Sequence, residues 1–166
     1  MRTGKYIALT ITVFLLAAAG AHAALTVTFV NPEHYRDDDF RSASKRKSII
    51  AELTRYFATL DQRYLKEGQR LHIEVLDARL AGHYEPWRAT FNDVRILRDT
   101  TPPRFKLRYT LRQAGEVLMK GEETVTDMNY LWSPNARGSS ERLAYEKDML
   151  RDWFRERFIK LKAPKA

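Results

Sequence analysis

The sequence contains no cysteine among its 166 residues. This absence excludes disulfide bonds, thiol catalysis, cysteine-ligated metal sites and lipid attachment at an N-terminal cysteine. Glycine is also scarce: the chain has seven, of which Gly4 and Gly20 lie in the first 23 residues. The others are too scattered for a glycine-rich phosphate loop, and neither a G-x-S-x-G nor a G-x-x-x-x-G-K-S/T motif is present.

Histidine is sparse too. After residue 23 the only histidines are His34, His72 and His83, and none forms an i,i+4 pair. A metal site needs several converging ligands, so we predict no metal site and no cofactor. The aspartate triplet at 37–39 lacks the spaced oxygen ligands and the glycine of a calcium loop. We interpret it instead as the lead-in to a helix, because acidic residues favour a helix N-terminus.

The first 23 residues have the pattern of a secretory signal peptide. Arg2 and Lys5 precede an uncharged, mostly apolar run over 6–19, and an A-x-A pattern follows. We expect cleavage between Ala23 and Ala24, which would place the remaining chain in the periplasm of a Gram-negative bacterium. An uncleaved anchor is the weaker alternative, because a spanning helix needs about 20 predominantly apolar residues and this run is shorter.

The remaining chain, residues 24–166, has the size of one domain. Loss of Arg2 and Lys5, with no acidic residue, lowers the net charge from +8 to +6. A basic excess favours anionic neighbours such as lipid headgroups, acidic glycans or nucleic acid. The charge is dispersed along the chain, however, so a solvated surface of mixed charge is the competing interpretation.

Hydrophobic periodicity predicts a β-strand, a helix and further strands in that order. Alternation predicts strands at 25–30, 71–76 and 94–96, with a bulge or a doubly buried face at 75–76. Apolar residues spaced by three and four predict a helix from Ser42 or Ser44 to about Leu65.

The clearest pattern is a hairpin over 104–127, in which apolar and charged residues alternate. A three-residue loop at 113–115 would place Gly115 at a left-handed position. That register pairs Leu111 with Val117, Tyr109 with Met119, Arg112 with Glu116, Lys106 with Glu122 and Arg108 with Lys120.

A second helix is expected from Ser139 or Ser140 to about Leu161. The predicted order is therefore β-α-β-β-β-β-α. This order indicates an α+β fold: a mainly antiparallel sheet of four to five strands with both helices packed on one face. The opposite face would be wet and mildly cationic.

The octapeptide AGHYEPWR at 81–88 has the composition of a catalytic or ligand-binding loop. Gly82 and Pro86 are residues that favour turns, however, and His83 has no nearby partner ligands. We therefore interpret it as an anchored turn, with Tyr84 and Trp87 folded over the sheet edge and their polar tips in water.

Two surfaces are candidate binding sites. One is a basic stripe that could dock phosphates or acidic sugars; the alternative is that it only keeps the outer face soluble, because Glu116 and Glu122 partly neutralise it. The stripe comprises Arg95, Arg104, Lys106, Arg108 and Lys120.

The other is the segment after the hairpin, where aromatic residues adjoin a polar loop at 133–140 and could form a ligand or peptide site. The alternative is a structural role, in which the aromatic residues pack under the C-terminal helix and the polar residues hold the loop by side-chain to backbone hydrogen bonds. The residues are Asp127, Asn129, Tyr130 and Trp132.

Several segments resemble one family. TDMNYLW at 126–132, LAYEKDMLRDWFRERF at 143–158, EVLDARLAGHYEPWR at 74–88, and DVRILRD and PPRFKLRYTL within 93–111 resemble the exported proteobacterial proteins called domain of unknown function 3016. The resemblance extends over the whole chain after the signal peptide. It implies a periplasmic single-domain protein, and it brings no activity, cofactor or catalytic residue.

The leading functional hypothesis is a periplasmic, non-enzymatic binding or interaction module that contacts an envelope protein or an anionic envelope component. It follows from the export signal and the absence of a catalytic constellation. The alternative is an envelope hydrolase with remote carboxylates such as Glu85 or Asp127. A nucleic-acid binder is a third hypothesis, disfavoured by export and by the dispersed charge.

Overall fold

The computed structural model of the protein describes residues 24–85, 87 and 94–160. The predicted signal peptide therefore lies outside the described residues. Within the described part of the chain, no helix combines the length and the apolar character needed to cross a membrane.

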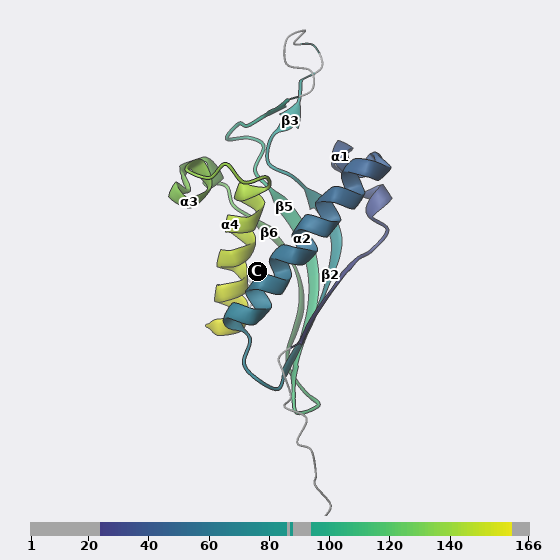
Figure 1. The fold of residues 1–166 in the computed structure, drawn as a ribbon, viewed down its shortest axis with the longest axis vertical. Coiled ribbons are helices and arrows are strands. Elements are labelled where there is room, and N and C mark those ends of the chain that lie inside the picture. The colour runs from purple at the N-terminus through teal and green to yellow at the C-terminus, as the bar shows by residue number, and fades with distance from the viewer. Residues whose placement is uncertain (1–23, 86, 88–93, 161–166) are drawn as a thin grey trace, which may run out of the picture.

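The core of the fold is a four-stranded sheet in the order β1-β2-β5-β6 (Figure 1). The strands are β1 (Ala24–Phe29), β2 (Gln69–Arg79), β5 (Arg104–Gln113) and β6 (Glu116–Thr126). β1 is parallel to β2, because helix α2 (Ala43–Tyr64) carries the chain back between them. The other two pairings are antiparallel, so the predicted mainly antiparallel α+β sheet is confirmed.

The predicted irregularity near residue 75 is a β-bulge. The pairing of β2 with β5 shifts between Val75 and Asp77, which leaves Leu76 as the extra residue. The shift lets Val75 and Ala78 both face the core, although they are three positions apart. It also keeps Asp77 and Arg79 on the opposite face.

The predicted hairpin register is wrong by one to two residues. Gln113 pairs with Glu116, so the loop is the two-residue turn Ala114-Gly115, with φ of 51° and 89°. Positive φ at both positions defines a type I′ turn, which matches the twist of the strands. A further shift next to Leu111 leaves Leu118 unpaired.

In the resulting register Leu111 faces Met119, Arg108 faces Glu122, and Thr110 rather than Arg108 faces Lys120. The register therefore brings Arg108 opposite an acidic residue and removes the predicted like-charge pair.

Two helices cover one face of the sheet (Figure 1). α2 begins after Ser42, as predicted. α4 (Ala144–Phe154) begins later than predicted and runs on into the π-helix η3 (Arg155–Ile159). Leu143 has a left-handed φ of 58°, and Ser139 Oγ accepts from the Glu141 amide. These local features hold 139–143 outside the helix.

The inner face of the sheet and both helices share one core. Tyr109 lies 5.8 Å from Trp153 and 5.3 Å from Phe158, measured between ring centroids. The two helices are joined directly by Tyr56, whose hydroxyl donates to the Lys147 carbonyl at 2.7 Å. The predicted arrangement of both helices on one face is therefore confirmed. Fully buried members of the core include Phe57, Phe105, Leu107 and Phe154.

The remaining elements lie around the end of the sheet at which β2 ends and β5 begins, which is the upper end in Figure 1. The short strands β3 (His83–Tyr84) and β4 (Arg95–Ile96) pair only with each other. The predicted strand at 94–96 therefore exists but is not part of the main sheet. Short helices fill the connections: η1 (Pro32–His34), α1 (Asp38–Arg41), η2 (Tyr130–Trp132) and α3 (Pro134–Arg137).

Candidate functional site

The aspartate triplet begins α1, as predicted. Asp37 is the N-cap residue, and its Oδ1 accepts from the Asp39 amide at 3.0 Å. The carboxylates of Asp37 and Asp39 are both buried, with relative exposures of 4% and 6%. Two buried carboxylates this close together require a positive partner.

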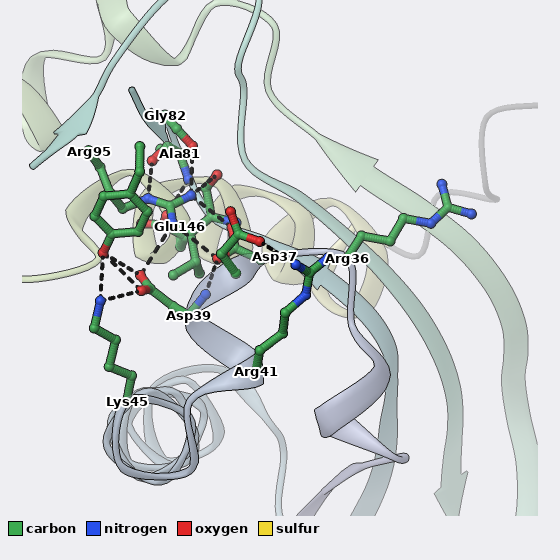
Figure 2. Close-up of polar contacts among 12 residues, drawn as sticks. Arg36, Asp37, Asp39, Arg41, Lys45, Ala81, Gly82, Arg95 and Glu146 are labelled. Carbon is green, nitrogen blue, oxygen red and sulfur yellow. Dashed lines mark hydrogen bonds and ion pairs between the residues drawn. The ribbon is translucent and has the colours of Figure 1, made fainter. Parts of the chain in front are cut away.

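That partner is Arg95 on β4 (Figure 2). Its guanidinium donates to Asp37 Oδ2 at 2.7 Å and to Asp39 Oδ2 at 3.2 Å. The same group donates to three backbone carbonyl oxygens, those of Leu80, Ala81 and Gly82. Arg95 therefore ties the start of α1 to the chain that leaves β2.

The predicted position of Arg95 on the solvent face of the sheet is therefore wrong. Val94 is exposed, whereas Arg95 is half-buried. Residues 95–96 form a strand, and the side chain of Arg95 points inward because it pairs there with the carboxylates of Asp37 and Asp39.

Tyr84 belongs to the same cluster. Its hydroxyl donates to Asp39 Oδ1 at 2.8 Å, and Lys45 Nζ lies 3.0 Å from that oxygen. Burial alone would raise the pKa of Asp39, but the hydrogen bonds from Lys45 and Tyr84 and the charge of Arg95 together lower it. Tyr84 thus directs its hydroxyl to a carboxylate, in contrast to the predicted position in water.

The rest of the octapeptide is partly as predicted. Gly82 has a φ of 71° and forms the expected turn. Trp87 is exposed, with a relative exposure of 72%. Glu85 is buried, and its Oε1 accepts from Arg98 Nη2 at 2.6 Å. Pro86 and residue 88 lie outside the described residues.

Glu146 on α4 completes this buried cluster (Figure 2). Its Oε1 accepts from the Ala81 amide at 2.7 Å, and the residue has a relative exposure of 3%. Burial raises the pKa of Glu146, against the opposing effects of the Ala81 amide and the Arg95 charge. The folded protein therefore binds a proton at Glu146 more tightly than the unfolded chain does.

This raised pKa predicts a pH-dependent effect of Glu146→Gln. Glutamine keeps the oxygen that accepts from the Ala81 amide but never ionises. Wild type should lose stability as pH rises from near the ordinary value of 4.5 through the raised pKa, whereas the variant should not. The variant should therefore become the more stable protein as pH rises.

Urea unfolding between pH 4 and pH 8 measures this difference. Glu141→Gln is the control, because Glu141 is exposed on the same side of the molecule. A stability difference that does not change with pH, or a variant that is less stable at neutral pH, would contradict the assignment.

The face of the sheet opposite the helices carries the predicted charged residues. Alternation places seven basic and three acidic side chains on it; in the described part of the chain no helix lies over this face (Figure 1). The basic residues are Arg70, Arg79, Arg104, Lys106, Arg108, Arg112 and Lys120, and the acidic ones are Glu74, Asp77 and Glu122.

The centre of this open face is electrically neutralised. Arg108 bonds to Glu122 at 2.9 Å on one side and to Glu74 at 3.2 Å on the other. Lys106 also pairs with Glu122, at 2.8 Å, whereas Glu116 lies opposite Gln113 and not Arg112. Two of the predicted binding residues, Lys106 and Arg108, are thus already satisfied by carboxylates.

The two ends of the open face differ from its centre. Arg79 lies directly opposite Arg104, and Arg70 lies directly opposite Arg112. Like charges in such positions destabilise a strand pair. Among the described residues, none of these four arginines forms an ion pair with a carboxylate. Unneutralised charge is therefore concentrated at the ends, roughly 30 Å apart at about 3.3 Å per residue.

A hollow adjoins the upper arginine pair. It has a volume of about 450 Å³ and is lined by Arg36, Arg79 and Arg104 together with Tyr84 and Arg95 of the buried cluster. A smaller hollow on the open face is lined by the same three exposed arginines and Lys106. The structure thus brings Arg95 and Arg104 to one concavity, although not on one sheet face.

The segment 126–132 has mostly structural contacts. Asp127 Oδ1 accepts from the Asn129 amide at 2.9 Å, which is the predicted bracing turn. Tyr130 is buried, and its hydroxyl donates to the Arg98 carbonyl at 2.7 Å. Trp132 is 76% exposed, so the prediction that it packs under the C-terminal helix is wrong. Asn129 is exposed.

Sequence reasoning missed several residues of the buried cluster. Asp37, Asp39 and Glu146 are buried and far from Arg95 in the sequence, and the exposed Lys45 reaches Asp39 from the surface. No motif links these residues. The available signal was the aspartate triplet itself, because acidic residues at the start of a helix that is packed against a core need a cation nearby. Tyr84 and Arg95 of the buried cluster form part of the wall of the hollow, and the exposed Arg36, Arg79 and Arg104 give the hollow its positive charge.

These features define an α+β protein with one helix-covered face and one open, basic face. A family model described as Protein of unknown function (DUF3016) matches residues 23–156, and the chain belongs to that family. A search of curated proteins found no match to this chain, and a search of solved structures found none either.

Proposed function

We propose that this protein is an exported, non-enzymatic binding module whose open sheet face holds an anionic glycan of the bacterial envelope. The observation that carries the proposal is the charge on that face, seven basic against three acidic side chains. An excess of this kind attracts polyanions and raises their local concentration.

The form of the face favours an extended polymer. The unneutralised arginine pairs lie roughly 30 Å apart along β2 and β5, by the rise of a strand. A small anion would meet only one of them, whereas an extended acidic glycan would meet both. A lipid surface is disfavoured, because β2 and β5 present charged and polar side chains of both signs, rather than large apolar ones, to the open side.

Binding to phosphorylated mannan, with unmodified mannan as the neutral reference, tests the proposal. Wild type should bind the phosphorylated polymer, and its affinity should fall as salt is added. Reversal of charge at Arg70, Arg79 and Arg104 together should weaken binding by about tenfold or more, because these arginines form no ion pair within the described residues and charged contacts of over about 1 kcal/mol each are lost.

The control is the same reversal at Lys47, Arg55 and Arg63, which are exposed on α2, in the layer that covers the other face. Equal loss in both variants, no binding to the phosphorylated polymer, or binding only to phosphatidylglycerol vesicles would contradict the proposal.

A further inference from the structure

We infer that Arg36, Arg79 and Arg104 form a subsite for one phosphate monoester group carried on a sugar. The inference rests on the proposed function, because it takes the open face as the working surface. It names the group that the upper end of this face recognises.

The first support is the geometry of the pair. Arg79 and Arg104 are direct cross-strand neighbours at the point where β2 ends and β5 begins. Placing two guanidinium groups opposite each other costs stability, and a sequence that breaks such a local rule does so most often at a functional position. A bound anion would convert the repulsion into two charge-assisted hydrogen bonds.

The second support is the third arginine. Arg36 comes from the loop after η1, and its side chain extends away from the buried cluster (Figure 2). It lines both hollows together with Arg79 and Arg104. Arg36 forms a long ion pair with Asp77, 3.5 Å from Nε to Oδ2, and its side chain is 75% exposed, so a ligand can reach it.

The third support is that the carboxylates in the hollow are already paired. Asp37 also lines it, but Arg95 binds this carboxylate with two nitrogens. Asp38 lines it too and pairs with Arg41 at 3.0 Å. The exposed arginines therefore supply the net charge that a ligand would meet.

The chemistry favours phosphate over carboxylate. A phosphate monoester offers three terminal oxygens and a charge of about −1.5 to −2 near neutral pH. A carboxylate offers two oxygens and a single charge, which one guanidinium already satisfies. The volume of about 450 Å³ exceeds that of a phosphate group, so space remains for the sugar that carries it.

Binding of mannose 6-phosphate, measured by calorimetry, tests the subsite. The pair Arg79→Gln and Arg104→Gln should weaken binding by about tenfold or more, the factor expected when charge-assisted hydrogen bonds are lost. The matched control is Arg70→Gln with Arg112→Gln, the other opposed pair on the same strands. This control should change the affinity by less than about twofold, and neither variant should unfold at a lower temperature, because each removes a repulsive pair.

Three results would overturn the subsite: no binding of mannose 6-phosphate by wild type, equal loss in both variants, or equal affinity for inorganic phosphate. If wild type still binds phosphorylated mannan in any of these cases, the proposed function survives and only the subsite fails. If wild type binds mannose 6-phosphate but not the polymer, the subsite survives and the glycan proposal fails.

Discussion

Replacing Arg95 with methionine is expected to lower the free energy of unfolding by about 3–5 kcal/mol, the range for removing one partner of a buried ion pair. The Arg95 side chain is only 18% exposed, and its partners Asp37 and Asp39 are 2% and 9% exposed. The variant would leave two buried carboxylates near each other without their main cation. It would also leave the Leu80, Ala81 and Gly82 carbonyls without the donor that joins them.

Denaturant unfolding of two further variants separates this cause from a general effect of losing an arginine. Arg108→Gln removes an ion-paired arginine at the surface and should cost less than about 1 kcal/mol. Adding Asp37→Asn and Asp39→Asn to Arg95→Met should recover part of the loss, because asparagine keeps the capping oxygen without the charge. A loss below about 1 kcal/mol for Arg95→Met would contradict the role assigned to the cluster.

Truncation of Phe154 to alanine is expected to have a comparable effect, about 3–5 kcal/mol, through loss of burial and creation of a cavity. Phe154 is fully buried, and its ring lies 6.1 Å from that of Tyr64 on α2 and 4.9 Å from that of Phe158 on η3, between centroids. It therefore joins the two helices that cover the sheet.

The control for Phe154 is Ile159→Ala, because Ile159 lies five residues further along and is 46% exposed. This substitution should change the free energy of unfolding by about 0.5 kcal/mol or less, as surface changes usually do. Equal effects at the two positions, measured by urea unfolding, would mean that the helices are not packed against a shared core.

Strong periodicity made the larger elements predictable. The apolar stripe of α2 and the alternation of β5 each extend over many residues, so a few exceptions do not alter the pattern. The packing of Trp153 and Phe158 against Tyr109 follows from the same patterns, because each element has only one apolar side to bury.

Local backbone choices were harder to predict. Ala114 adopts a left-handed φ that alanine seldom takes, so the sequence favoured a longer loop with glycine alone in that conformation. Leu143 is similar, because a leucine at this position does not predict the left-handed conformation that makes α4 begin later than expected. The strand pairing on both sides of the turn sets the conformation of Ala114, which is itself exposed, whereas Leu143 packs against the core.

The candidate site was predictable in part. Arg104 was identified from the alternation of β5, which places it on the open side. Arg79 and Arg36 were not, because their relevance depends on the register of β2 with β5 and on a loop that folds beside it. The predicted register did place Glu122 beside Lys106, and the structure contains that ion pair. It did not show that Arg108 is neutralised, because that depends on Glu122 and on Glu74 of a third strand.

If the open sheet face, and its upper end above all, receives the anion, the arginine side chains there should change their environment on binding. The most direct measurement follows the arginine Nε–Hε signals by NMR during titration with phosphorylated mannan. We expect the signals of Arg79 and Arg104 to shift the most, while those of Arg55 and Arg63 on α2 stay in place. Shifts centred on the α2 arginines, or spread evenly over all arginines, would contradict it.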